Sequence, residues 1–226
     1  MPNDHVAIDG PVSSGKTTNA QLLAAQTGHL YLDTGAMYRA VAYLALMNGV
    51  DLDNESGLVA MVGHHTIAIV SDSETIAGYR VIVDGKDTGE RLFDPDVAAA
   101  VSTVAALPAI RAELVGRQRT IAAAGPVVMA GRDIGTVVLP DARFKFFLTA
   151  SVDERARRRH AEFEARGIVV SFDEVRAQIV ERDRLDSTRT HSPLRAAPDA
   201  VTIDSTDMQP EDVVAKMRAV MEAARA

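Results

Sequence analysis

The sequence contains neither cysteine nor tryptophan. Without cysteine, a disulfide framework and a thiol nucleophile are both excluded, and we expect a reducing, cytoplasmic location. No apolar run approaches the roughly 18 residues that are needed to span a bilayer. Residues 1–5 are polar and do not resemble a secretory signal, so we expect a soluble, unprocessed chain that does not act at a membrane.

Lysine is also scarce, since only four of the 24 basic residues are lysine and the other 20 are arginine. The planar guanidinium group suits bidentate binding of phosphate, although an arginine-rich codon usage explains the bias equally well. The net charge of −7 argues against general binding of nucleic acid or of a membrane surface. We therefore expect small-molecule partners, and a local anion site remains compatible with the acidic balance.

The 226 residues, of which 47% are hydrophobic, suit one α/β domain with room for small insertions. The patterns predict strands at residues 5–9, 30–32, 127–130, 143–148 and 200–203. They predict helices at residues 16–27, 36–47, 56–62, 95–105 and 108–124, two more that begin at Ser151 and Ser171 with capping boxes, and a last one near Pro210. Strands separated by helices indicate a parallel sheet with helices on both faces.

Residues 64–93 interrupt this alternation. Residues 66–70 and 79–83 alternate apolar and polar positions or are β-branched, and Asp84-Gly85 has the composition of a tight turn. We expect an inserted antiparallel hairpin or three-stranded sheet here. His64 and His65 invite a metal-binding interpretation, but they are adjacent and lack acidic neighbours, so they are better read as ordinary residues of the insertion.

Residues 10–17 match the P-loop pattern G-x-x-x-x-G-K-[ST]. Its glycines let several N–H groups turn toward a phosphate, and the following helix points its positive end at the same anion. Lys16 reaches the outer phosphates, and the Thr17 hydroxyl can ligate Mg²⁺. The motif follows a strand and opens a helix, as the function requires. The expected ATP-binding residues are Gly10, Pro11, Val12, Ser13, Ser14, Gly15, Lys16, Thr17 and Thr18.

Three classes of protein use such a loop. A GTPase switch is disfavoured because the sequence has no Asn-Lys-x-Asp to bind guanine, and the chain is short for an ATPase motor. A kinase needs a second anion site that faces the loop, since catalysis is mostly positioning and neutralisation of charge. Candidates for that second site are Arg39, Arg111, Arg132, Arg182 and Arg189. A regulatory module that binds a nucleotide without turnover also remains open.

Four blocks together resemble the bacterial type of cytidylate kinase, a family of P-loop nucleoside monophosphate kinases. They are residues 8–17, 32–39, 131–138 and 182–194, and they come in the order that the family has. The likeness extends from about residue 5 to residue 205, and the insertion at 64–93 resembles one in the monophosphate-binding region of the family. The resemblance implies transfer of the γ-phosphate of ATP to CMP or dCMP, with Mg²⁺, by a monomer.

The resemblance also implies the domain organisation. The whole chain, 1–226, would be one kinase domain with a core at about 1–33, 107–154 and 168–226. The monophosphate-binding region would occupy about 34–106, and a short helical lid about 155–167. Adenylate-kinase-like and shikimate-kinase-like enzymes remain rivals, because they share the loop and the lid, although they lack the block at 131–138.

Roles for individual residues follow from the same blocks. Tyr38, Arg39 and Arg132 match positions that bind the acceptor phosphate, and Thr34 stands where serine is also found. Ser102, Arg111 and Asp133 match positions that recognise cytosine; Arg182 and Asp186 match positions that hold the sugar, and Arg189 matches a further substrate arginine. Alternatively, Arg132-Asp133 could be a surface ion pair, and Arg182 and Asp186 could form an i,i+4 pair on a solvated helix face.

The lid contains the basic run 155–159. In kinases of this type, lid arginines close over the phosphates and exclude water, which would otherwise accept the phosphoryl group. We expect Arg158 to act in catalysis together with Lys16 and Arg132, with Arg159 as a second lid candidate. Arg155 and Arg157 have two interpretations: closure over the phosphates, or an exposed basic face that pairs with Glu154 or Glu162, which fits them at least as well.

Overall fold

The computed structural model describes residues 4–72, 74–75 and 79–225. The chain packs as two compact units, one made of Met1–Leu30 and Pro126–Ala226 and the other of Tyr31–Gly125. The partition into core, monophosphate-binding region and lid stays a prediction. The helix at 108–123, which that partition places with the core, falls in the second unit.

A parallel sheet forms the centre of the fold, as the sequence predicts. Its strand order is β2-β6-β1-β7-β8. The strands are β1 (Val6–Asp9), β2 (Leu30–Asp33), β6 (Val127–Gly131), β7 (Phe144–Thr149) and β8 (Val201–Asp204). In the first unit β1 pairs in parallel with β6 and β7, and β7 pairs with β8. All residues of β1 and β6 are buried, which is typical of a central parallel sheet covered by helices.

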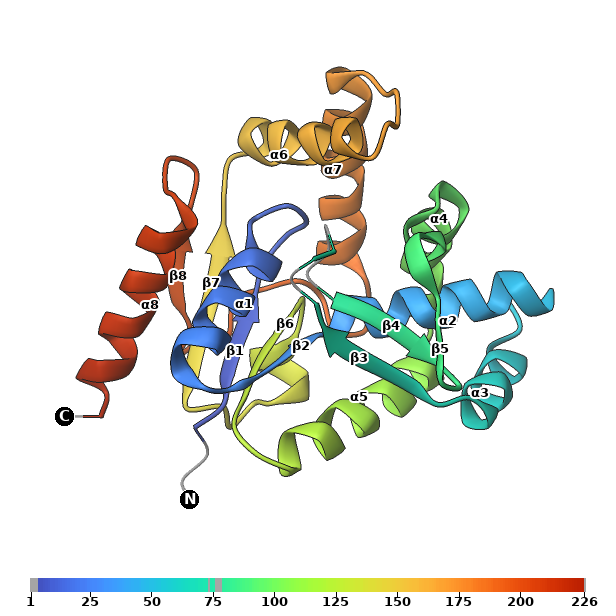
Figure 1. Cartoon of the computed structure of the whole chain (residues 1–226), viewed down its shortest axis with the longest axis horizontal. Helices are drawn as coiled ribbons and strands as arrows, with labels where there is room; N and C mark the ends of the chain where they lie inside the picture. The colour runs from blue at the N-terminus through green and yellow to red at the C-terminus, as the bar shows by residue number, and fades with distance from the viewer. Residues whose placement is uncertain (1–3, 73, 76–78, 226) are drawn as a thin grey trace. The chain divides into compact units, whose positions relative to one another are not determined.

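Helices cover this sheet in the first unit (Figure 1). They are α1 (Lys16–Thr27), α6 (Val152–Ala165), α7 (Phe172–Thr188) and α8 (Pro210–Ala223). Helix α1 packs against β6 and α8, while α6 and α7 pack against each other through Ala156, Val175 and Ile179. The predicted fold class is therefore confirmed, and the helix ends at Gly28 and Gly167 lie where the glycines indicated.

The second unit combines helices with a small antiparallel sheet. Its helices are α2 (Thr34–Asn48), α3 (Glu55–His64), α4 (Pro95–Ala106) and α5 (Pro108–Ala123), and a 3₁₀ turn spans Gly89–Phe93. The sheet has the order β3-β4-β5, with strands Ile67–Ser71, Tyr79–Val83 and Lys86–Asp87. The insertion is thus three-stranded; within 64–93, residues 73 and 76–78 lie outside the described part of the chain.

The Asp84-Gly85 pair makes the tight turn between β4 and β5. Both residues have positive φ, 49° and 78°, as such a turn requires. Asp84 also accepts a hydrogen bond from the backbone N–H of Thr66 and lies 2.6 Å from Nδ1 of His65. The His65 bond and the Thr66 bonds lower the pKa of Asp84 to about 2. His65 therefore ties the start of the insertion to its turn.

Two local features differ from the sequence prediction. Ser171 begins α7 with a full capping box, whereas at Ser151 only the serine half forms, because the Glu154 carboxylate pairs with Arg157 and Arg158 instead. The sequence patterns also missed a single π-helical turn at Ile134–Val138, directly after the Arg132-Asp133 pair.

Within the described residues, no single helix has the length and apolar character of a membrane span. The bent pair α4–α5 meets that test only when its two helices are taken together, by length and composition.

Candidate functional site: a phosphate loop and a guanidinium cluster

The predicted phosphate loop joins β1 to α1. Gly10 has φ of 154°, and a Cβ atom there would come 2.0 Å from the carbonyl oxygen of Leu148 at the end of β7, so only glycine fits. Ser13 and Gly15 have φ of 57° and 86°. When residues in the left-handed region alternate with residues in the right-handed region, successive backbone N–H groups point to one side. A loop of this kind forms an anion-binding concavity in this way.

Lys16 is nearly buried at the start of α1. Its Nζ donates to the carbonyl oxygen of Pro11 at 2.5 Å and lies 3.4 Å from the Ser14 hydroxyl, so the ammonium group closes the loop on itself. A phosphate in the loop would offer the same ammonium a charged acceptor in place of a neutral one, which is the stronger bond. Thr17 is half-buried next to Lys16, and Thr18 is exposed.

The carboxyl ends of four neighbouring strands bring the polar residues together. The parallel register aligns Asp9 with Gly131 and with Phe147, and Thr149 with Asp204. The segments that follow these strands, starting at Gly10, Arg132, Ala150 and Ser205, therefore leave the sheet at the same edge. Ligands bind at this edge in open α/β sheets.

A guanidinium cluster surrounds Asp186 in the first unit. Nε of Arg132 donates to Asp186 at 2.8 Å. Burial alone would raise the pKa of Asp186, but the charges of Arg132, Arg182 and Arg189 outweigh it, and the pKa lies below its usual range. Arg132 is thus paired with Asp186 of α7, which lies 54 positions further along the chain, as part of a four-residue cluster.

The segment after α7 folds back onto the same cluster. Nε of Arg189 donates to the carbonyl oxygen of Ser192 at 2.5 Å, and the N–H of Leu194 donates to the carbonyl oxygen of Asp186 at 2.8 Å. Ser192 adopts a φ of 53° to make this return. The 182–194 block is therefore a helix end and a tight loop that hold one another.

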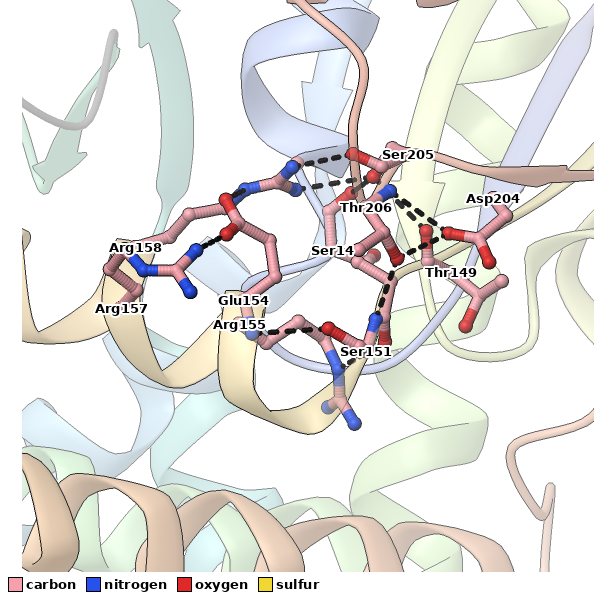
Figure 2. A network of polar contacts seen from close by, with 12 residues as sticks. Ser14, Thr149, Ser151, Glu154, Arg155, Arg157, Arg158, Asp204, Ser205 and Thr206 are labelled. Atoms are coloured by element: carbon pink, nitrogen blue, oxygen red, sulfur yellow. Dashed lines mark hydrogen bonds and ion pairs between the residues drawn. The ribbon is translucent and has the colours of Figure 1, made fainter.

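Arg158 of α6 bonds to the segment after β8 (Figure 2). Its two terminal nitrogens donate to the hydroxyl and the carbonyl oxygen of Ser205, at 3.1 and 2.6 Å, and its Nε donates to Glu154 at 2.9 Å. The Ser205 hydroxyl also lies within hydrogen-bond distance of the carbonyl oxygens of Ser14 and Thr149. Ser205 thus connects the phosphate loop, the end of β7 and the predicted lid arginine.

The other arginines of the basic run have different partners. Arg155 is buried and makes a bidentate pair with Asp183 of α7, at 3.0 and 2.6 Å, so of its two interpretations the exposed face is wrong. Arg157 is exposed and pairs with Glu154, as expected. Arg159 pairs with Glu162 at 2.6 Å and stacks on the ring of Phe163, all within α6.

A cavity of about 310 Å³ lies beside the phosphate loop. Its walls include Gly15, Thr18 and Asn19 at the start of α1, Arg158 of α6, and the segment between β8 and α8. Asn19 is buried and donates from its amide to the carbonyl oxygen of Gly15 at 2.8 Å. The cavity is of the size class of small-molecule sites.

The remaining predicted substrate residues lie in the second unit. Arg111 is buried, stacks 5.5 Å from the centre of the Tyr38 ring and donates to the carbonyl oxygen of Ala105 at 3.2 Å. Arg39 stacks on Phe93 at 5.5 Å. Thr34 is buried at the first position of α2, and Ser102 is half-buried on α4.

Two residues at the sheet edge were missed by the sequence analysis. Asp9 ends β1 and is 3% exposed, and Ser205 follows β8 and is 1% exposed. Both obey the rule that polar residues at the carboxyl ends of parallel strands gather at the ligand edge. That rule, applied to every strand rather than to the motif-bearing ones, would have found both.

A glycine-rich loop between the first strand of a parallel sheet and a helix, with an arginine cluster at the same sheet edge, defines a P-loop kinase. A model of one such family, cytidylate kinase, matches residues 6–223, so the chain belongs to the cytidylate kinase family. It is 50% identical to the cytidylate kinase of Enterococcus faecalis over 96% of this chain and 95% of that protein. It is 49% identical to the cytidylate kinase of Pelotomaculum thermopropionicum over 100% and 98% of the two chains.

Proposed function

We propose that the protein transfers the γ-phosphoryl group of ATP to CMP or dCMP and forms ADP with CDP or dCDP. One observation in particular supports this: β1 and β6 are adjacent and in parallel register, with Asp9 opposite Gly131. The phosphate loop follows one strand, and the Arg132-Asp133 pair follows the other. A donor site and an acceptor-recognising pair at one sheet edge are what a phosphoryl transfer between two nucleotides needs.

ATP would place its phosphates in the loop 10–18 and its adenosine in the adjoining cavity of about 310 Å³. The loop amides, the positive end of α1 and the Lys16 ammonium would bind the phosphates. Arg158 borders the cavity and already reaches across it to Ser205, so the guanidinium group lies beside the expected nucleotide.

Mg²⁺ would enter with ATP. The ion usually keeps several waters and binds through substrate phosphates with only one or two protein groups, so a single hydroxyl ligand from the loop, that of Thr17, fits. When bound, the ion neutralises charge on the β- and γ-phosphate oxygens.

CMP would be recognised by its base and its phosphate. Cytosine has an N4 amino donor beside the N3 and O2 acceptors, so the Asp133 carboxylate can accept from N4 while Arg111 or Ser102 donates to the acceptors. Uracil has a carbonyl in place of N4, which would face the carboxylate and leave polar groups unpaired. Arg182 and Asp186 would hold the sugar. The acceptor phosphate would be bound by Tyr38, Arg39 and Arg132, and further substrate contacts would come from Thr34 and Arg189.

The reaction needs no nucleophilic side chain. An oxygen of the CMP phosphate, ionised near neutral pH, forms the bond to the γ-phosphorus, while the bond between that phosphorus and the ADP oxygen breaks. Lys16, Arg132 and Arg158 would offset the charge on the transferring group, and the lid would keep water away. The proposal includes a monomeric enzyme. It also includes a cytoplasmic location, which the lack of cysteine supports.

ADP formation with CMP, dCMP, UMP, AMP and shikimate as acceptors tests the proposal. We expect the highest kcat/KM with CMP or dCMP, and near-complete loss of activity in Lys16→Ala.

Asp133→Ala should lose most activity with CMP and keep its affinity for ATP. Asp153→Ala, which removes an exposed carboxylate on α6, should match the wild type. Unchanged CMP turnover in Asp133→Ala would refute the base-recognition site. A preference for AMP or shikimate would refute the substrate assignment, and an absence of turnover with any acceptor would indicate a binding module.

A further inference from the structure

Asp9 lies in the first of the four blocks, where no role was assigned to it, and it occupies the centre of the sheet edge. It is the last residue of β1 and is 3% exposed. One carboxylate oxygen accepts a hydrogen bond from the N–H of Ile134 at 2.6 Å, and the other accepts from the N–H of Gly135 at 2.8 Å. These two residues begin the π-helical turn Ile134–Val138, immediately after Arg132 and Asp133.

The first N–H groups of a helical turn have no partner within the turn, and an aspartate at the N-cap commonly supplies one from its own side chain. Asp133 holds that N-cap position but makes no capping bond with its side chain. Asp9 caps the turn instead, from a neighbouring strand. The Asp133 side chain is therefore not needed to cap this turn, although an aspartate at the N-cap commonly does so.

We propose that Asp9 is a positioning residue for the acceptor site. By capping the turn in place of Asp133, it fixes the segment 131–135 against the end of β1 and sets where the Arg132 and Asp133 side chains lie. Because Gly10 follows Asp9 directly, the same carboxylate fixes that segment relative to the first residue of the phosphate loop. This inference rests on the proposed CMP site and adds a residue that does not itself touch the substrate.

The hydrogen bond between the Asp9 carboxylate and the N–H of Gly135 can also be disturbed by a substitution at Gly135. A Cβ atom at Gly135 would lie 3.3 Å from Oδ2 of Asp9 and 3.2 Å from Cδ of Lys145, which is tighter than most real contacts. Gly135→Ala should therefore push the N–H of residue 135 away from the carboxylate. This second variant disturbs the same bond and leaves Asp9 in place.

Steady-state kinetics with CMP and with ATP as the varied substrate test the proposal in Asp9→Asn. The amide presents an NH₂ group to one of the two N–H donors, so one bond is lost and two donors face each other. We expect the KM for CMP to rise by roughly tenfold or more, since a lost bond to a charged group is worth about that factor. The KM for ATP should stay within about twofold of the wild type, and Gly135→Ala should show the same selective rise.

Asp199→Asn is the matched control, because it makes the same carboxylate-to-amide change at an exposed residue that pairs with Lys145, beside Gly135. Its two KM values should equal those of the wild type. Unchanged CMP affinity in folded Asp9→Asn and in Gly135→Ala would overturn the proposal, as would parallel increases in both KM values that merely follow a loss of stability. Should Asp9→Asn not fold, titration of Gly135→Ala with CMP by calorimetry decides by the same criterion.

Asp133→Ala separates this inference from the proposed function. If Asp133→Ala abolishes CMP turnover and Asp9→Asn does not affect it, the acceptor site stands and the positioning role is refuted. If neither variant affects CMP turnover, the acceptor site itself is misplaced.

Discussion

Asp9 is a buried carboxylate, and burial disfavours its charged form. Burial raises its pKa to about 6, and the neighbouring charge of Asp133 raises it further, while the N–H groups of Gly135 and Ile134 and the charge of Lys16 act in the opposite direction. In the unfolded chain the same group would titrate at its ordinary value of 3.8. The folded chain therefore holds the proton of Asp9 over a pH range in which the unfolded chain has released it.

This difference predicts how stability depends on pH. The contribution of Asp9 is fully present below about pH 4 and is lost as the pH rises through about 6, and its size is about 3 kcal/mol. The unfolding free energy of the wild type minus that of Asp9→Asn should therefore rise by that amount between about pH 7 and pH 4. Urea unfolding at a series of pH values measures it, and a difference that does not change with pH would contradict the assigned pKa.

At the scale of helices, α6, which contains most of the predicted lid, is anchored more firmly than its basic sequence indicates. Helix α6 packs on α7 through Ala156, and the buried fork of Arg155 adds two bonds to Asp183 and one to the carbonyl oxygen of Ala150. The same guanidinium group lies 3.4 Å from the carbonyl oxygen of Val12 in the phosphate loop. Arg155 therefore ties α6 to α7 and to the loop, while Arg158 extends to Ser205.

The contrast between Arg155 and its neighbour predicts a large difference in stability. Removal of one partner from a buried pair leaves the other charge unpaired, so Arg155→Ala should lower the free energy of unfolding by about 3 kcal/mol. Arg157→Ala, on the same helix, removes an exposed pair and should change it by no more than about 0.5 kcal/mol. Urea unfolding of the two variants at pH 7 makes the comparison, and equal effects would mean that the Arg155–Asp183 pair does not anchor the helix in solution.

On the scale of the whole molecule, most of the fold could be predicted because local signals set it. Glycines end α1 and α6, prolines begin α4, α5 and α8, and the Asp84-Gly85 turn fixes the β4–β5 hairpin. The burial of Arg155 and the capping by Asp9 could not be predicted in this way. Their partners lie 28 and 125 positions along the chain, and nothing in a local pattern says which arginine of a basic run will face a neighbouring helix.

The proposed acceptor residues come from both compact units, and this yields the last prediction. Arg39 of the second unit is one of the residues that we propose bind the CMP phosphate. Loss of a bond between two charged groups is worth about 2 kcal/mol, so Arg39→Ala should raise the KM for CMP roughly thirtyfold and leave the KM for ATP unchanged. Stopped-flow or coupled ADP-formation assays with each substrate varied provide both values.

Arg91 supplies the matched control, because it belongs to the same unit and stacks on a ring in the same way, 5.8 Å from the centre of Tyr43, against 5.5 Å for Arg39 over Phe93. Arg91→Ala removes a similar cation–π contact, worth about 0.5–1 kcal/mol at an exposed site, but no proposed substrate contact. Equal KM values for CMP in the two variants would mean that Arg39 only packs on its ring. A rise confined to Arg39→Ala would support the proposed contact between Arg39 and the CMP phosphate.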